Sequence, residues 1–400
     1  MPESMGFIQA DAAQARPPPR LRLRSVVAVA VVGVAMVVAS AVMVARMPAP
    51  RTDLPDVSTL VLDREGVLLR AFTVDEGRWR LPVALEGVDP TFIKLLVAYE
   101  DQGFFSHKGV DPRAVVRAGW QALRAGRVVS GASTLTMQTV RLITGARERT
   151  VLRKVRELVD ALKLEQALSK DEILLRYLHL APYGGNIEGV RAASLAYFGR
   201  EPDLLTLAQA ALLVALPQAP ESRRPDRFPL AAERARARVL DQLVARGAIS
   251  PSAAQRAKRE SIPTGRRAVP RLAPHVARRL VSEHPERRIH TTTLRHGWQV
   301  ALEELAARRV LHIGPRVSAA IVVMEQATGR LLASVGAARF LDPARAGHVD
   351  MTRAVRSPGS TLKPAIYGLG IDAGLVARGT LMEDAPQSFA GYEPDNFDDA

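Results

Sequence analysis

The sequence predicts a mainly α-helical protein with a single N-terminal transmembrane helix, a helical domain and the beginning of an α+β domain. Three observations support this fold class. Residues 25–45 carry no charge, helix caps and helical spacing dominate residues 90–216, and apolar segments on both sides of Thr328-Gly329 predict a β-hairpin. At about 150 residues per domain, 400 residues suffice for two or three such parts.

The apolar segment from Ser25 to Ala45 predicts the membrane span. Its 21 residues form a helix of roughly 31 Å, which matches the ~30 Å hydrocarbon core of a bilayer. Residues 1–24 contain four arginines, so the positive-inside rule places this tail in the cytoplasm and the chain after residue 45 outside. A cleaved signal peptide and a buried core helix are the alternatives, but the segment is long for the apolar part of a signal peptide. We expect an uncleaved anchor.

The composition excludes several classes of site. The chain has no Cys, which excludes a disulfide scaffold, thiol catalysis and Cys-ligated zinc, and its eight His form no His-Glu-x-x-His pattern. We predict no metal site and no certain cofactor, and a dependence on divalent cations stays open. The net charge of +14 indicates an anionic partner. Nucleic acid is the weakest candidate, because aromatic residues make up only 5% of the chain and form no stacking cluster.

The other elements follow in order along the chain. Residues 46–57 form a linker that contains Pro, and residues 58–72 predict a β-hairpin. Helices are expected to begin after Asp111-Pro112, after Ser133 and after the Ser169–Glu172 capping box, and the last of this series ends at Pro217. We assign residues 58–228 to the helical domain, 229–312 to a connector and 313–400 to the second domain.

Two clusters in the helical domain lie at predicted helix ends. The first contains carboxylates, and the second contains hydroxyls. Residues 100–111 join Glu100 and Asp101 to Phe104 and His107, although a Glu-Asp pair is usually part of a solvated helix face. Residues 131–138 place hydroxyls at a helix N-terminus, where backbone N–H groups can bind an anion. Ordinary capping by Ser133 explains these hydroxyls equally well.

Two further clusters are cationic or rich in Gly. Arg153 and Glu157 share a helix face beside Lys154, with Arg149 just before and Arg141 one helix earlier. They form either a surface ion pair worth ~0.3–0.5 kcal/mol or a cationic site for a phosphate leaving group. Residues 181–189 (Ala-Pro-Tyr-Gly-Gly-Asn-Ile-Glu-Gly) predict an ordered loop before a helix.

The order and spacing of the four clusters resemble the glycosyltransferase domain of class A penicillin-binding proteins, the bifunctional peptidoglycan synthases. Residues 100–109 meet the pattern Glu-Asp-x-x-Phe-x-x-His-x-Gly, residues 131–138 meet Gly-x-Ser-Thr-x-Thr-x-Gln, and residues 153–157 meet Arg-Lys-x-x-Glu. The Gly-Gly-Asn-x-Glu-Gly loop and the Tyr-Phe-Gly at 197–199 also match. His179 departs from the family, which usually has Asn at this position.

The resemblance implies a lysozyme-like helical domain that polymerises lipid II into glycan strands in the bacterial inner membrane. In this interpretation Glu100 deprotonates the acceptor 4-OH, which attacks the donor anomeric carbon with inversion and releases undecaprenyl pyrophosphate. Glu157 is the second catalytic carboxylate and orients the cations. The resemblance assigns substrate binding to Asp101, Phe104, His107, Ser133, Thr134, Gln138, Arg141, Arg149, Arg153, Lys154, Asn186 and Glu188.

The second domain contains one Ser-x-x-Lys pattern, Ser360 to Lys363. Four residues alone are a weak signal, but Ser-Pro-Gly-Ser-Thr-Leu-Lys-Pro after a hairpin resembles the nucleophile segment of penicillin-binding transpeptidases, most closely in the 1C branch. Lys363, one helical turn from Ser360, would act as its base. No Ser-x-Asn or Lys-Thr-Gly motif follows before residue 400, so we expect an incomplete domain and little acylation by penicillin.

Two other functions remain in competition with glycan synthesis. A lysozyme-like lytic hydrolase also needs a catalytic Glu but has no use for the cationic cluster at 149–157. An inactive scaffold that binds cell-wall synthesis or hydrolase proteins has no use for Glu100 and Glu157. We therefore expect a membrane-embedded enzyme whose partners are lipid II and the growing glycan strand, with a cytoplasmic N-terminus and periplasmic catalytic domains.

Overall fold

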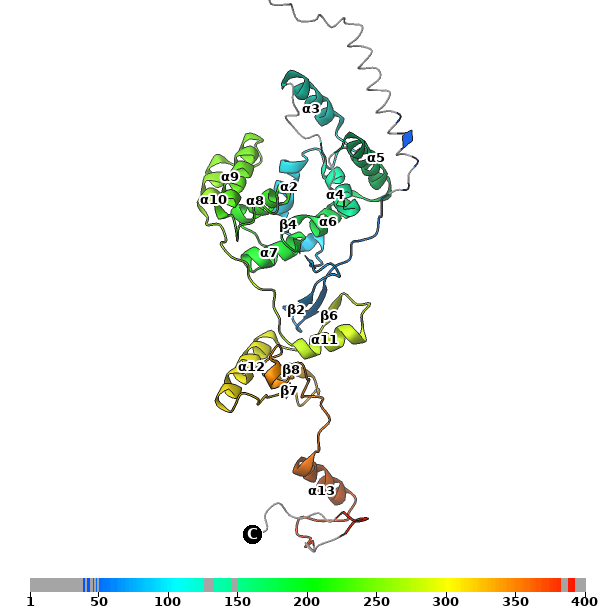
Figure 1. The fold of residues 1–400 in the computed structure, drawn as a ribbon, viewed down its shortest axis with the longest axis vertical. Coiled ribbons are helices and arrows are strands. Elements are labelled where there is room, and N and C mark those ends of the chain that lie inside the picture. The colour runs from blue at the N-terminus through cyan, green and yellow to red at the C-terminus, as the bar shows by residue number, and fades with distance from the viewer. Residues whose placement is uncertain are drawn as a thin grey trace, which may run out of the picture. The chain divides into compact units, whose positions relative to one another are not determined.

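The computed structural model describes residues 39, 42–43, 46, 48, 50–125, 133–145, 150–382 and 388–392 (Figure 1). Contacts divide the chain into two units. The first comprises residues 1–305 with 322–335, and the second comprises residues 306–321 with 336–400. Helices predominate in the first unit, which confirms the mainly α-helical prediction.

The predicted membrane span lies almost wholly outside the described residues, as does the tail at residues 1–24. Among the helices that the structure does describe, none combines the length and the apolar character that crossing a bilayer requires.

A three-stranded sheet joins the beginning of the first unit to a segment much later in the chain. Strands β1 (Thr59–Leu62) and β2 (Leu68–Phe72) pair antiparallel, as the hairpin prediction requires. Strand β6 (Ile289–Thr291) pairs with β1 in parallel, so the order is β2-β1-β6. In the turn, Asp63 Oδ1 accepts hydrogen bonds from the backbone N–H groups of Glu65 and Val67, each 2.8 Å long.

In the sequence between β2 and β6 lies a series of helices. They are α2 (Pro90–Glu100), α3 (Pro112–Ala125), α4 (Leu135–Thr144), α5 (Val151–Ala167), α6 (Lys170–Leu180), α7 (Val190–Phe198), α8 (Leu207–Ala215), α9 (Pro229–Ala245) and α10 (Pro251–Arg259). Both bonds of the capping box predicted at Ser169 and Glu172 are present. The cap predicted at Ser133 is wrong by one residue, because the Thr134 hydroxyl accepts the bond from Met137 N.

The core is organised around α8. This helix (Leu-Ala-Gln-Ala-Ala-Leu-Leu-Val-Ala) carries no charge, and a helix that is apolar on all sides is stable only when it is enclosed. It packs against α2, α7, α9 and α10, and residues 210–216 are all buried. A second layer is formed by α4, α5 and α6, which pack against one another (Figure 1).

The Gly-rich loop that the sequence predicts is a small sheet. Strand β3 (Trp79–Arg80) pairs in parallel with β5 (Ile187–Glu188), which pairs antiparallel with β4 (Pro182–Gly184). Gly189 then begins α7 with φ +82°, and its N–H donates to Ala181 O at 2.9 Å. The loop is therefore fixed on both sides by backbone hydrogen bonds.

The rest of the first unit has its own small apolar cluster, formed by Leu69, Ala273, Val276 and Leu294. Helix α11 (Pro274–Glu283) contributes to it, and α12 (His296–Arg309) begins close by and continues into the second unit. Strands β7 (Ile321–Met324) and β8 (Leu331–Val335) pair with each other, which confirms the hairpin predicted around Thr328-Gly329.

Short 3₁₀ turns also lie in the helical part of the first unit, at η1 (Leu85–Gly87) and η2 (Leu216–Gln218).

The described residues of the second unit form the 3₁₀ turns η3 (Val310–His312), η4 (Pro343–Arg345) and η5 (Gly359–Leu362), followed by α13 (Lys363–Asp372). Buried Arg345 donates to the carbonyls of Gly314, at 2.8 Å, and Val317, at 2.5 Å, and so holds the preceding loop. Ser360 and Lys363 lie where the prediction puts them, at a helix start, and both are exposed.

Candidate active site

Glu100 is held at both carboxylate oxygens by side-chain amides. It is the last residue of α2 and is half-buried. Its Oε2 accepts from Gln138 Nε2 on α4, and its Oε1 accepts from Gln218 Nε2 on η2, each at 2.9 Å. Three elements therefore fix one carboxylate, which restricts its rotamers while leaving part of it open to a ligand.

Gln218 is a residue that the sequence patterns do not identify. It lies 118 positions from Glu100, and its Oε1 accepts from Arg223 Nη1 at 3.0 Å. The same Arg223 nitrogen donates to Ala215 O at 2.7 Å, at the end of α8. Burial lowers the pKa of Arg223, and Arg238 adds to this shift. The only sequence signal is Pro217, which ends the helix and fixes where the next side chain can point.

Four of the predicted substrate-binding residues make contacts or are buried between the end of α2 and the start of α4. Asp101 is buried, and its Oδ2 accepts from Leu135 N at the first residue of α4 at 2.9 Å. His107 Nε2 lies 2.9 Å from Asp101 Oδ1. Thr134 Oγ1 donates to Gly109 O at 2.6 Å, and Phe104 is fully buried. These contacts fix the start of α4 relative to α2, and therefore the position of Gln138 relative to Glu100.

Glu157 is the centre of a second charged cluster. It is buried on α5 and accepts from Arg141 Nε at 3.0 Å and from Lys154 Nζ at 3.1 Å. Lys154 Nζ also donates to Ser133 Oγ at 2.5 Å. The structure thus brings Ser133, Arg141, Lys154 and Glu157 together from three segments. The half-exposed cations reach solvent while the carboxylate stays covered, with side-chain exposures of 41%, 46% and 9% for Arg141, Lys154 and Glu157.

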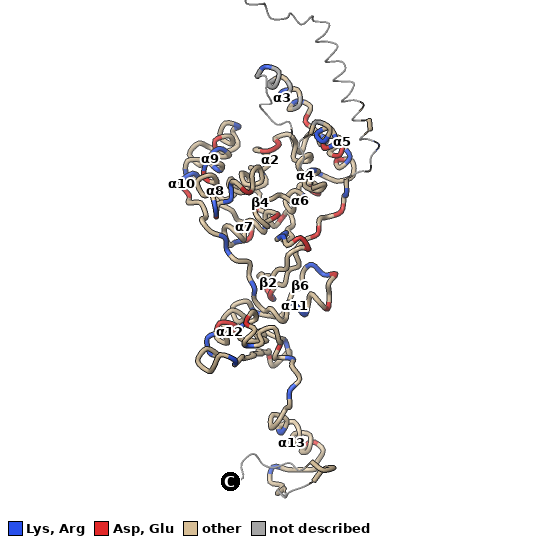
Figure 2. Tube along the Cα trace, viewed as in Figure 1, with Lys and Arg blue, Asp and Glu red and all other residues tan. Residues whose placement is uncertain are grey.

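Two further predicted cations, Arg149 and Arg153, are close to this cluster in the sequence. Arg153 is half-buried, and its N–H donates to the Thr150 cap of α5 at 3.2 Å. Arg149 lies outside the described residues. Figure 2 shows basic and acidic residues interspersed along α5. A buried carboxylate between two cations can hold them in a fixed geometry, which is what an electrostatic site for a departing anion requires.

Asn186 and Glu188 belong to a different cluster. Glu188 is buried and accepts from Arg78, and from Arg80 Nε at 3.0 Å and Nη2 at 2.5 Å. Asn186 Nδ2 donates to Gly77 O at 3.1 Å. These bonds join β5 to β3, and within the described residues none of them reaches Glu100 or Glu157.

His179, near the end of α6, forms a hydrogen bond with the backbone at Val83. Its Nε2 accepts from Val83 N at 3.1 Å, which requires the neutral ring with the proton on Nδ1. Burial lowers the pKa of His179 to about 4, so this tautomer is maintained at neutral pH. His179 therefore provides a hydrogen-bond acceptor for the backbone at Val83.

The two remaining predicted residues, Ser360 and Lys363, lie in the second unit. The backbone N–H of Lys363 donates to Ser360 O, while no side-chain hydrogen bond joins the two among the described residues. Over the same described part of the chain, no group of three His, Asp or Glu side chains could hold a metal ion.

Comparison with known protein families matches two consecutive parts of the chain. The family model described as transglycosylase matches residues 65–244, and the one described as penicillin binding protein transpeptidase domain matches residues 319–399. The first match contains Glu100, Gln138, Glu157 and Gln218, and the second contains Ser360 and Lys363.

Individual relatives agree with these matches. Penicillin-binding protein 1C of Escherichia coli (strain K12) is 43% identical over 339 residues, 85% of this chain and 44% of that protein. Penicillin-binding protein 1A of the same strain is 40% identical over 180 residues, 43% of this chain and 21% of that protein. Penicillin-binding protein 2D of Bacillus subtilis (strain 168) is 29% identical over 371 residues, 87% of this chain and 52% of that protein. The chain spans about half or less of each relative.

The order of the two matched domains indicates to which family the chain belongs. A transglycosylase match is followed by a penicillin-binding transpeptidase match in one polypeptide, and the relative with 43% identity aligns across 85% of this chain. The chain therefore belongs to the class A penicillin-binding proteins.

Proposed function

We propose that this chain is a membrane-anchored peptidoglycan glycosyltransferase that polymerises lipid II into glycan strands. The observation that carries the proposal is the pairing of two carboxylates with different surroundings. Glu100 is held by neutral amides and is open to a ligand, whereas Glu157 is covered and lies between Arg141 and Lys154. Such a division suits a reaction that needs a base at one place and a stabilised anionic leaving group at another.

In the proposed reaction Glu100 removes the proton from the acceptor 4-OH. The oxygen attacks the anomeric carbon of the donor, the new glycosidic bond forms with inversion, and the bond to undecaprenyl pyrophosphate breaks. The pyrophosphate leaves with the electron pair of that bond. Arg141, Lys154, Arg153 and Arg149 stabilise its charge, and Glu157 holds the first two in place.

The remaining predicted residues take positioning roles in this proposal. Gln138 and Gln218 orient Glu100, and Asp101, His107 and Thr134 hold α4 in place so that Gln138 reaches it. Phe104 supports this segment from the core, with Lys170 Nζ 4.6 Å from its ring centroid. Ser133 lies beside Lys154 and faces the phosphate site, while Asn186 and Glu188 shape the loop before α7.

We make separate proposals for the second domain and for the membrane anchor. Ser360 is the candidate nucleophile of a transpeptidase and Lys363 its base. Residues 25–45 are the proposed membrane span in the bacterial inner membrane, with the first 24 residues cytoplasmic and the catalytic residues periplasmic.

The glycosyltransferase proposal is tested by Glu100→Gln with purified lipid II. The variant keeps acceptors and donors near Gln138 and Gln218 but has no base, so we expect polymer formation to fall by about 10²–10⁴-fold. Product is measured by gel separation of labelled glycan strands. Glu86→Gln, an exposed Glu on η1, is the control and should polymerise at the unaltered rate. Equal rates for Glu100→Gln and the starting protein would refute the assignment, and degradation of purified sacculi without polymer formation would establish a lytic hydrolase instead.

A further inference from the structure

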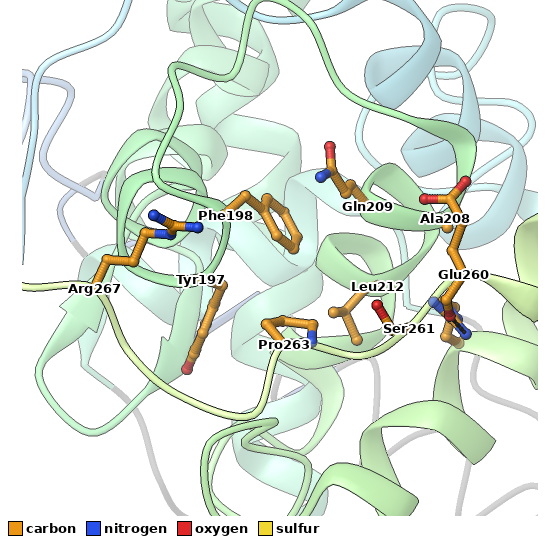
Figure 3. Close-up of a pocket in the computed structure, with 10 residues that line it drawn as sticks. Tyr197, Phe198, Ala208, Gln209, Leu212, Glu260, Ser261, Pro263 and Arg267 are labelled. Atoms are coloured by element: carbon orange, nitrogen blue, oxygen red, sulfur yellow. Dashed lines mark hydrogen bonds between the residues drawn. The ribbon is translucent and has the colours of Figure 1, made fainter.

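A polar pocket of about 440 Å³ lies between the end of α7, the first turns of α8 and the segment that follows α10 (Figure 3). It shares no residue with the hydrogen-bonded set around Glu100. Phe198, Leu212 and Pro263 gather around its middle. Its volume falls within the range of small-molecule sites.

A buried cation in the wall has an unused donor. Arg236 on α9 is only 2% exposed, and its Nη2 donates to Lys258 O at 3.1 Å and Glu260 O at 2.7 Å. These two bonds satisfy carbonyls at the end of α10 and explain why the guanidinium is buried. They leave Arg236 Nε, a buried donor with no hydrogen-bond partner in the described structure. This nitrogen has almost no accessible surface, so the buried guanidinium adds positive charge to the wall of the pocket but does not bond a ligand through Nε.

Opposite charges stand on the two sides of the pocket. Figure 3 shows Arg267 beside Phe198 on one side and Glu260 beside Ser261 on the other. Thr206 Oγ1 donates to Glu260 Oε2 at 2.8 Å and so orients the carboxylate. The backbone N–H of Arg267 donates to Ala196 O at 2.7 Å, which anchors that residue at the end of α7. Its guanidinium makes no hydrogen bond or ion pair with any described residue.

We propose that this pocket binds a short peptide with free termini, in its zwitterionic form. The peptide carboxylate pairs with Arg267, and the amino group pairs with Glu260. The apolar residues in the middle pack against the peptide side chains. A cation and a carboxylate on opposite sides of an apolar centre are complementary to a ligand with opposite charges at its two ends.

The first experiment measures how binding to the full chain in detergent depends on the length of the ligand and on its charged ends. Isothermal titration calorimetry is run with alanine, Ala-Ala and Ala-Ala-Ala. We expect saturable binding of at least one peptide and weaker binding of alanine, which has no second residue to pack against the apolar centre of the pocket. Acetylation of the peptide amino group and amidation of its carboxylate should each weaken binding about tenfold, because each removes one charge-assisted pair.

Variants then assign each end of the peptide to a residue. In Arg267→Ala the amidated and free peptides should bind equally, and in Glu260→Gln the acetylated and free peptides should bind equally. Arg259→Ala, an exposed neighbour outside the pocket, is the matched control and should bind the free peptide with the original affinity. No saturable binding, alanine binding as tight as peptide binding, or a penalty for amidation that persists in Arg267→Ala would each overturn the proposal.

Discussion

Gln218 completes the contacts of the Glu100 carboxylate, and it does so from a turn rather than from a helix. Arg223 uses one nitrogen to hold both the Gln218 amide and the last carbonyl of α8. The amide therefore cannot flip without losing its bond to Arg223. At the scale of single residues, the proposed base therefore has an amide of fixed orientation at its Oε1.

We predict that Gln218→Ala lowers kcat for lipid II polymerisation about tenfold and leaves KM nearly unchanged, because the amide orients the base rather than the substrate. Gln218→Glu should in addition move the acid limb of the pH–rate profile to higher pH, since a second carboxylate makes ionisation of Glu100 less favourable. Steady-state kinetics between pH 5 and 8 measure both effects. Gln166→Ala, exposed on α5, is the control. An unchanged kcat and pH profile in both Gln218 variants would show that the contact is incidental.

The residue patterns predict which side chains lie together better than they predict how far those side chains are buried. Glu100, Gln138, Lys154 and Glu157 lie in clusters as expected, because local motifs hold them at fixed spacings. Burial of Phe104 and of the Asp101 carboxylate is not visible in a motif, since it depends on which helices cover them. Gln218 is missed for a related reason: its contact joins residues 118 positions apart.

At the scale of elements, the loop before α7 is tightly constrained at Gly189. Gly189 has φ +82° and ψ 150°, a region that is essentially restricted to glycine. A Cβ there would lie 2.9 Å from His179 O and 3.0 Å from Leu178 O, so the end of α6 leaves no room for it. The sequence indicates an ordered loop at this position, but only the structure explains why Gly is required.

Gly189→Ala should reduce the free energy of unfolding by about 2–4 kcal/mol, because backbone strain and a contact with two carbonyls add together. Thermal or urea unfolding monitored by circular dichroism measures the change. Gly66→Ala provides the matched control, since Gly66 has φ +86° and no atom within 4 Å of the added Cβ. Its loss should be close to 1 kcal/mol, from strain alone. Equal losses in the two variants would mean that the α6 carbonyls move aside.

Helix periodicity and caps predict most of the helices because those signals are local. The box at Ser169, the Pro after Asp111 and the stop at Gly145 all appear where the sequence places them. The Ser133 cap is wrong because two adjacent hydroxyls compete, and Thr134 also bonds Gly109 O. Strand β6 has only three residues and no recognisable alternation, so its partner cannot be inferred from pattern.

At the scale of the whole molecule, buried His179 links stability to pH. Burial lowers its pKa to about 4 from the ordinary 6.5, so the folded protein keeps the ring neutral while the unfolded chain takes up a proton below pH 6.5. The free energy of unfolding should therefore decrease as pH falls from 6.5 to 4, by up to about 3 kcal/mol from this group. Above pH 6.5 the contribution of His179 should not change.

This dependence is tested by denaturant unfolding of His179→Gln, followed by tryptophan fluorescence between pH 4 and 8. Gln can accept from Val83 N without titrating, so the variant should lose the extra destabilisation at low pH. His348→Gln, which changes an exposed His, should keep it. If the curves of His179→Gln and the starting protein are parallel across this range, His179 does not cause the loss.

The parallel pairing of β1 with β6 has a consequence for the order in which the protein can form. Thr292 N donates to Leu62 O across 230 positions of sequence, so the helical segment is an insertion between two strands of one sheet. Strand β2 follows β1 directly, but a ribosome that has made β1 must make all of α2 to α11 before β6, the second neighbour of β1, is available. Until then β1 has an unpaired edge, which is the part of a nascent sheet most prone to wrong pairing. The β1–β6 pairing can therefore form only after every residue of the helical insertion has been synthesised.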